Sequence, residues 1–293
     1  MAINKTPINL YKYTSAETAS TILKTQKIKI TNPNEFNDPF DCNIPNFEMA
    51  NKSLTDEIKR QLKKDIPELK NKHSKEVALF EINIKQKIDE LKILVNQEFT
   101  KISNEWEGII ENFRVLSLAK SEKNILMWSH YASYHTGACI GFKADSSISK
   151  QCQQVDYGHG STILRNFVNH LVRIIITRID VLSQNVHFAD IFSDKAADET
   201  LNVFIEYLYL KRKEWNYEQE FRLVLPKTSG MIEYNAQMSL IEFNKNDLEE
   251  IILGSKMKQE QVDELSAFIK QKYPGVLVKK AIKQGWELQF IEV

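Results

Sequence analysis

The sequence predicts an α+β fold, with a mixed or antiparallel sheet, flanking helices and a long helical, hairpin-like insertion. Three observations predict it. Short apolar or alternating runs of strand length recur along the chain, helical periodicities separate them irregularly rather than as a βαβ repeat, and residues 53–112 become rich in Lys, Glu and Gln. Because no internal repeat or Gly/Ser linker marks a boundary, we expect a single α+β domain over 1–293 with 53–112 inserted in it.

The N-terminal part alternates strand and helix before a turn-rich loop. Residues 10–13 form a short aromatic run suited to a strand, and Ser15 is a candidate N-cap for a helix over 16–25. The alternation of 27–31 predicts a second strand. Residues 32–41 are dense in Asn, Asp and Pro and predict a loop without regular structure.

The insertion and the C-terminal half supply the remaining elements. Apolar residues at helical spacing from Val77 to Val95 predict a long helix that follows a shorter one, together forming an antiparallel pair. Further helices are expected over 124–132, within 161–212 and over 258–272. The expected strands are 114–119, 137–142, 155–157, 221–226, 238–243 and 248–253, followed by a hairpin of 276–282 and 287–291 around Gln284-Gly285.

Composition restricts the class of protein. Lys+Arg and Asp+Glu both number 39, so the chain has no net field to recruit a membrane or nucleic acid, although local patches leave nucleic acid open. Cys42, Cys139 and Cys152 are too irregularly spaced for a disulfide framework or a zinc site, and no structural metal is expected. The start lacks a secretory signal and the apolar stretches are too short to span a bilayer. We therefore expect a cytoplasmic protein.

Two glutamates form the leading candidate site. Glu218 and Glu220 lie two residues apart between aromatic side chains, and on an extended segment both would point the same way, with Arg222 on the same face and Trp215 nearby. Adjacent acids repel at positions where a strand favours Leu, Val or Thr, and such a conflict is typical of a functional site. The alternative is an exposed strand with a surface Glu–Arg pair that contributes about 0–1 kcal/mol.

The loop Asn37-Asp38-Pro39-Phe40-Asp41 is a second candidate. Asp38 precedes proline and is therefore biased toward extended geometry, and Asn37 is able to close an Asx turn. A carboxylate held in this way would suit a substrate hydroxyl, a base or a metal ion. The alternative is a rigid turn in which Phe40 is a hydrophobic plug.

A third candidate combines hydroxyl, imidazole and aromatic groups in Trp128-Ser129-His130-Tyr131. If this segment is helical, His130 and Tyr131 share a face, and His130 would be an acid, a base or a hydrogen-bond donor to a ligand. The alternative is a structural histidine with satisfied hydrogen bonds. His130 and His135 are five residues apart, which does not match the i, i+4 spacing of a helical metal pair.

In this order the motifs resemble those of a large bacterial family of unknown function. The resemblance covers nearly the whole chain outside the insertion. It rests on Leu10-Tyr11-Lys12-Tyr13, Asn37-Asp38-Pro39-Phe40-Asp41, Met127-Trp128-Ser129-His130-Tyr131-Ala132, Gly137 with Ile140-Gly141-Phe142, and Trp215 with Glu218, Glu220 and Arg222.

The order of elements is also similar, at the level of the fold, to the ADP-ribosyltransferase superfamily. This resemblance implies NAD as substrate, Glu220 as the catalytic carboxylate beside the nicotinamide-side ribose, and Glu218 as its partner that orients the acceptor. His130 joins the expected catalytic residues, and the residues expected to bind the cofactor are Lys12, Tyr11, Tyr131, Trp128 and Ser129. Three features depart from the superfamily: Lys12 stands where Arg or His is usual, no Ser-Thr-Ser motif is present, and the strands expected from 238 on extend past what that fold requires.

Three functions remain open, so the sequence does not decide whether the chain is an enzyme. The first is an NAD-consuming ADP-ribosyltransferase-like or glycohydrolase-like enzyme with a small-molecule ligand. The second is a non-catalytic binding or assembly module with a structural acid–Arg cluster, whose insertion 53–112 contacts a protein partner. The third is a metal-dependent phosphodiesterase or nuclease that holds Mg²⁺ with Asp38, Asp41, Glu218 and Glu220.

Overall fold

The computed structural model describes residues 8–43, 60, 84–157, 166, 169–170, 202, 204–234 and 238–293. The chain divides into two compact units. The first consists of Met1–Asp41, Glu111–Tyr157 and Lys211–Val293, and the second of Cys42–Ile110 and Gly158–Leu210. The expectation of one domain carrying an insertion at 53–112 stays a prediction. The helices expected before residue 84 and within 161–212 lie largely outside the described residues.

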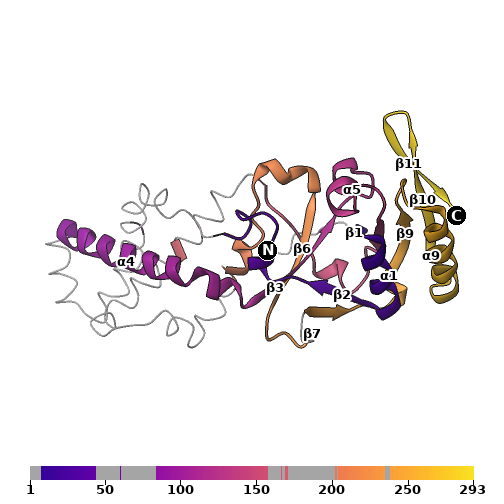
Figure 1. The fold of residues 1–293 in the computed structure, drawn as a ribbon. Coiled ribbons are helices and arrows are strands. Elements are labelled where there is room, and N and C mark those ends of the chain that lie inside the picture. Colours follow the sequence, from indigo (N-terminus) through magenta and orange to yellow (C-terminus); the bar gives the residue numbers. More distant parts are fainter. Residues whose placement is uncertain are drawn as a thin grey trace. The chain divides into compact units, whose positions relative to one another are not determined.

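The first unit is built on a mixed sheet in the order β11-β10-β9-β4-β1-β3-β6-β5. All neighbouring strands are antiparallel except β9 and β10, which are parallel and connected by helix α9 (Gln259–Lys272) that lies beside them (Figure 1). The strands are β1 (Leu10–Thr14), β3 (Phe113–Ala119), β4 (Ala138–Phe142), β5 (Gln153–Gln154), β6 (Glu220–Pro226), β9 (Leu248–Leu253), β10 (Leu277–Gln284) and β11 (Glu287–Glu292). The α+β class is therefore confirmed.

A smaller antiparallel sheet, in the order β2-β8-β7, completes the first unit. It contains β2 (Lys27–Ile30), β8 (Ser239–Glu242) and β7 (Ile232–Tyr234), and an isolated bridge from Thr31 to Val115 connects it to β3. The sequence did not predict β7, because it is three residues long and only Ile232 is buried. The strand expected over 155–157 is found two residues earlier, as β5.

Strand alternation divides the core of the first unit between the two faces of the large sheet. Leu10 of β1 joins the larger hydrophobic cluster, which includes α1 (Ala16–Thr25) and α9. Tyr11 and Tyr13 join the smaller cluster, which includes α5 (Ile125–Tyr131). The sheet is thus covered on both faces, so that its central strands are buried.

Helix caps confirm several expected boundaries. The Ser15 hydroxyl accepts a hydrogen bond from the Thr18 N–H at 3.1 Å and caps α1, as predicted. Asn124 caps α5 by accepting from the Leu126 N–H at 2.9 Å. The loop 32–41 is less irregular than expected, because Asn32 caps a single 3-10 turn at Pro33–Glu35. Other 3-10 turns are Ser149–Gln151, Lys213–Glu218 and Lys245–Asp247.

The segment between α5 and β4 turns through left-handed backbone geometry. Ser133, Tyr134 and His135 have φ values of 47°, 54° and 71°, a conformation that is unfavourable for residues other than glycine. The turn brings Gly137 against its neighbours: a Cβ at this position would lie 2.1 Å from the carbonyl oxygen of Thr14. Gly137 is therefore required by close approach of the backbone.

The second unit is described chiefly by helix α4 (Ile84–Ile110). Phe99, Ile102, Trp106 and Ile110 are buried at helical spacing, and the Trp106 indole N–H donates to the Cys42 carbonyl oxygen at 3.0 Å. The long helix expected in the insertion is thus present over the described residues. Within the described part of the chain, no helix combines the length and the apolar character needed to cross a membrane.

We expect Gly137→Ala to lower the free energy of unfolding by about 1–3 kcal/mol, because the added methyl group meets backbone atoms that cannot rotate away. Gly230→Ala is the matched control, since a Cβ there has no atom within 4 Å, and it should change stability by less than about 0.5 kcal/mol. Urea unfolding of the two variants measures the difference. Equal stability of the two variants would show that the backbone contact at Gly137 is not tight.

Candidate functional site

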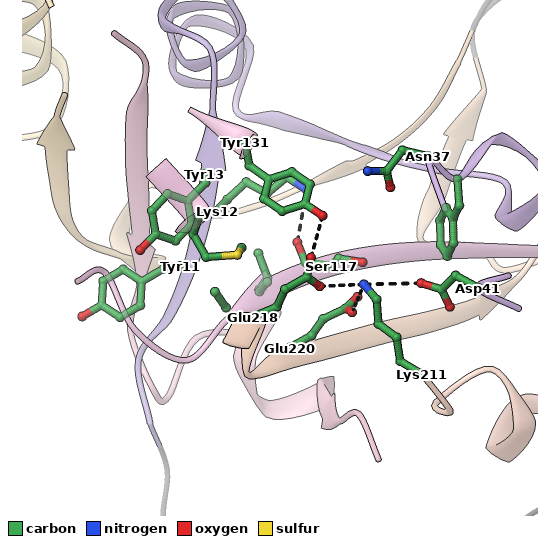
Figure 2. Close-up of a pocket in the computed structure, with 14 residues that line it drawn as sticks. Tyr11, Lys12, Tyr13, Asn37, Asp41, Ser117, Tyr131, Lys211, Glu218 and Glu220 are labelled. Atoms are coloured by element: carbon green, nitrogen blue, oxygen red, sulfur yellow. Dashed lines mark hydrogen bonds and ion pairs between the residues drawn. The ribbon is translucent and has the colours of Figure 1, made fainter. Parts of the chain in front are cut away.

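The candidate site is a cavity at the centre of the large sheet. β1 pairs with β4 along its whole length and β3 pairs with β6 in the same way, but β1 and β3 share a single ladder position, Tyr11 opposite Ala119. A cavity of about 100 Å³ lies beside this point (Figure 2). It is lined by Tyr11, Lys12, Tyr13, Phe36, Asn37, Asp41, Ser117, Leu118, Ala119, Met127, Tyr131, Lys211, Glu218 and Glu220.

Both glutamates reach this cavity, but not by the extended geometry that the sequence predicted. Glu218 ends the 3-10 turn Lys213–Glu218, Gln219 adopts a left-handed conformation with φ 45°, and Glu220 begins β6. The turn at Gln219 redirects the chain between the two acids. Their side chains converge because of this turn, and not because they alternate along one strand.

Arg222 is fully buried, so the expected surface Glu–Arg pair is wrong. Its Nε lies 2.8 Å from Oε1 of Glu220, and its Nη2 lies 2.5 Å from Oδ2 of Asp41. The loop that carries Asp41 and the strand that carries Glu220 therefore meet at one guanidinium group. A buried ion pair of this kind depends on all its partners, because the removal of one leaves a buried charge unpaired.

Lys211 joins the two glutamates and was not singled out from the sequence. Its Nζ lies 2.6 Å from Oε2 of Glu218, 3.0 Å from Oε2 of Glu220 and 3.4 Å from Oδ2 of Asp41 (Figure 2). The Trp215 ring centre lies 5.1 Å from the same ammonium group. In the sequence Lys211 begins a Lys-Arg-Lys run, a pattern typical of a solvated turn, so only the fold identifies it.

The two acids have opposite shifts in pKa. Burial would raise the pKa of Glu220, but the Arg222 and Lys211 cations outweigh it and lower this pKa to about 2. Burial raises the pKa of Glu218 above its usual value, with Lys211 opposing the shift. Neighbouring carboxyls whose pKa values are driven apart are typical of acid–base chemistry, because one stays ionised while the other is able to exchange a proton.

Lys12 is held on β1 with few partners. Its Nζ donates to the Ser117 carbonyl oxygen at 3.1 Å, which is its single hydrogen bond to the part of the chain that the structure describes. Burial lowers the pKa of this amine, and the carboxylates of Glu220 and Glu218 oppose the shift. An ammonium group has three donors. Lys12 is thus able to donate to a ligand in the cavity.

Three tyrosines line the cavity and differ in orientation. The Tyr131 hydroxyl donates to Oε1 of Glu218 at 2.6 Å, so it belongs to the acid cluster. The hydroxyls of Tyr11 and Tyr13 point away from the cluster (Figure 2) and donate to Glu250 and to the Ser121 carbonyl oxygen. Their rings remain on the cavity wall. The expected pocket residues Tyr11, Lys12 and Tyr131 are therefore brought together with both glutamates.

The motif around His130 is divided between the cavity and its surroundings. Trp128, Ser129 and His130 do not line the cavity. Trp128 has no exposed surface, and its indole N–H donates to the Glu122 carbonyl oxygen at 2.8 Å. Ser129 Oγ lies 3.1 Å from Nε2 of His135, and His130 is exposed. Of this motif, Met127 and Tyr131 reach the cavity.

Some residues of the loop 37–41 line the cavity, and others lie outside it. Asn37 and Asp41 line the cavity. Asp38 instead accepts a hydrogen bond from the Phe40 N–H at 2.9 Å, so it forms the Asx turn that was expected of Asn37. Phe40 is 62% exposed, and the expectation that it acts as a hydrophobic plug is wrong. Within the described ranges no group of three or more His, Cys, Asp or Glu side chains is arranged to hold a metal ion.

Comparison with known proteins gives a match to a family model over part of the chain. Residues 127–223 match a family model described as protein of unknown function (DUF2971). The match spans about a third of the chain and includes Tyr131, Lys211, Glu218, Glu220 and Arg222. It supports the expected similarity to an uncharacterised family, and the resemblance to ADP-ribosyltransferases stays a prediction. Neither the curated proteins nor the solved structures give a match.

We expect Glu220→Gln to flatten the dependence of stability on pH below pH 4.5. In the unfolded chain a glutamate has a pKa of about 4.3, whereas folding lowers that of Glu220 to about 2. As the pH falls through this interval the unfolded state binds a proton first, so the wild-type protein loses stability, on the order of 3 kcal/mol in total. At neutral pH the pair is intact and its contribution is complete.

Urea unfolding at pH 7, 4.5 and 3 measures this loss, with Glu287→Gln in the exposed strand β11 as the control. The control should follow the wild-type protein, while Glu220→Gln should be less stable at pH 7 and lose less on acidification. An unchanged slope in Glu220→Gln would contradict the ion pair.

Proposed function

We propose that the cavity is the active site of an enzyme that consumes NAD, either as an ADP-ribosyltransferase or as an NAD glycohydrolase. The observation that carries the proposal is the convergence of Glu218 and Glu220 on one cavity with the ring of Tyr131. Such a reaction breaks the bond between a positively charged nicotinamide ring and ribose, so positive charge is present in the substrate and develops on the sugar. Carboxylates and aromatic faces stabilise positive charge.

Glu218 is the carboxylate that we assign to the substrate. Tyr131 and Lys211 each donate to one of its oxygens, and a carboxylate offers about four lone-pair positions, so it is able to accept from a ribose hydroxyl as well. Glu220 accepts from both Lys211 and Arg222, and we assign it the role of anchor. This assignment exchanges the roles that the sequence predicted for the two acids.

The raised pKa of Glu218 suits it to proton transfer. In the proposed step the bond between ribose C1 and the nicotinamide nitrogen breaks, and its electron pair leaves with nicotinamide. The resulting oxocarbenium ion is captured by water or by the hydroxyl or amine of an acceptor. The proton released by that nucleophile passes to Glu218, which returns it to solvent.

Cavity size restricts how NAD would bind. The volume of about 100 Å³ is below the roughly 300–1,000 Å³ typical of sites that enclose a drug-sized ligand. We therefore place only the nicotinamide end of NAD in the cavity. A second cavity, of about 240 Å³, also has Glu218 in its wall and is lined by Ser121, Lys123, Asn124, Tyr217 and Gln219. This second cavity supports the binding of a longer substrate, part of which would lie on the other side of Glu218.

A non-catalytic module is the second candidate, and the charge balance of the cluster favours it. Asp41, Glu218 and Glu220 are already paired with Lys211 and Arg222, so the cluster is able to stabilise the fold without a ligand. A protein partner at 53–112 belongs to this candidate. The phosphodiesterase stays a prediction without support from the described residues, because Asp38 caps a turn and the other three acids are paired with cations.

We expect the wild-type protein to release nicotinamide from NAD, and Glu218→Gln to lower kcat by about 10²–10³ because the amide neither stabilises positive charge nor accepts the proton. Chromatography of nicotinamide measures the rate, and the thermal shift with NAD measures binding. Glu287→Gln, in β11, should leave both unchanged.

Absence of both nicotinamide release and a thermal shift in the wild-type protein would favour the non-catalytic module. Full activity in Glu218→Gln combined with loss of activity in Glu220→Gln would instead restore the assignment predicted from the sequence.

A further inference from the structure

The chain crosses between its two compact units at four places, and three of the crossings end on the acid cluster. On the side of the first unit the crossing residues are Asp41, Glu111, Tyr157 and Lys211. Asp41 binds Arg222, Lys211 binds both glutamates, and Tyr157 binds the backbone of Glu220. Glu111 lies apart from the cluster and forms an ion pair with Lys227 at 3.4 Å.

The crossing at Tyr157 holds the backbone at the start of β6. The Tyr157 hydroxyl oxygen accepts a hydrogen bond from the Glu220 N–H at 2.6 Å, and the Val155 N–H donates to the Glu220 carbonyl oxygen at 2.9 Å. Burial raises the pKa of Tyr157, so its hydroxyl stays neutral. Both backbone groups of Glu220 are thus fixed by Val155 and Tyr157, which lie just before the crossing.

The crossing at Lys211 holds the side chains of the acid pair and is tied to the crossing at Tyr157. The Lys211 N–H donates to the Asp156 carbonyl oxygen at 3.1 Å. Its side chain then carries the ammonium group to Glu218 and Glu220. The backbone of Lys211 is thus fixed at the point from which its ammonium group reaches both glutamates.

We propose that Tyr157 and Lys211 are positioning residues that fix the geometry and the protonation of Glu218 and Glu220. A nearby opposite charge lowers a carboxyl pKa by roughly 1–3 units, and this effect weakens as the charges separate. A shift of the chain at Lys211 therefore changes the pH at which Glu218 binds a proton. The catalytic meaning of this shift rests on the proposed function, whereas the positioning itself does not.

An insertion at the crossing tests the proposal without removing any side chain. Two glycines are inserted between Leu210 and Lys211, and the matched control carries the same insertion between Ile110 and Glu111, the crossing that does not touch the cluster. Lys211→Met serves as the reference for complete loss of the charge. NMR of ¹³C-labelled glutamate carboxyls, with the Glu218 resonance assigned from Glu218→Gln, measures the pH midpoint of Glu218.

We expect Lys211→Met to raise the midpoint of Glu218 by roughly 1–3 pH units, since an opposing cation is removed. The insertion before Lys211 should raise it by a smaller amount, and the insertion before Glu111 should leave it at the wild-type value. An unchanged midpoint after the first insertion, or an equal shift after both, would overturn the proposal.

Tyr157→Phe tests the second positioning residue and removes a single oxygen atom, so it keeps the proposal testable if the insertions prevent folding. Loss of the acceptor should make the Glu220 amide exchange with solvent at least about tenfold faster, whereas Tyr273→Phe, whose hydroxyl binds the distant Leu23 carbonyl oxygen, should leave that exchange unchanged. Unchanged exchange in Tyr157→Phe would overturn the role of Tyr157. Neither readout uses NAD, so a failure to release nicotinamide would defeat the proposed function alone.

Discussion

The buried guanidinium of Arg222 is the constraint on which the candidate site depends. It has no exposed surface, and an isolated charge in that environment would cost several kcal/mol. Asp41 and Glu220 supply the opposite charge, which brings the Asn-rich loop against the first residue of β6. Asp41 and Glu220 carry two negative charges against the single positive charge of Arg222, and Glu218 adds a third negative charge. The ammonium group of Lys211 then balances part of this excess negative charge. Each of these buried charges therefore needs the next one as its partner.

Much of the fold follows from local pattern. The alternation of 27–31, the Ser15 cap and the Gly285 turn each act through neighbouring residues, and each was predicted where the structure has it. β7 and β5 were missed or misplaced because they are two or three residues long and depend on their partner strands. The second unit joins two distant segments: the composition of 53–112 marks most of the first, but no local signal in the sequence pairs it with Gly158–Leu210.

The candidate site was predicted in part, and for a reason that the structure changes. Glu218 and Glu220 are acids beside aromatic and apolar residues in the sequence, and they share a cavity with Lys12 and Tyr131. Their side chains converge, however, because Gln219 has a left-handed backbone conformation. The alternation of side chains along a strand does not predict such a turn. Lys211 was hidden because a basic run beside a helix is ordinary, and its role arises from contacts with residues that are far away in the sequence.

The single ladder position shared by β1 and β3 leaves part of the connection between the two halves of the large sheet to side chains. On one side of this seam, β1 is continuous with β4, β9, β10 and β11, and on the other β3 is continuous with β6 and β5. Across this seam the Lys12 ammonium group donates to the Ser117 carbonyl oxygen at 3.1 Å, and the Tyr13 hydroxyl donates to the Ser121 carbonyl oxygen at 2.7 Å. Side chains of β1 therefore supply contacts that backbone hydrogen bonds would supply in a full β1–β3 ladder. The same two side chains line the cavity, so that the wall of the candidate site also joins the two halves of the sheet.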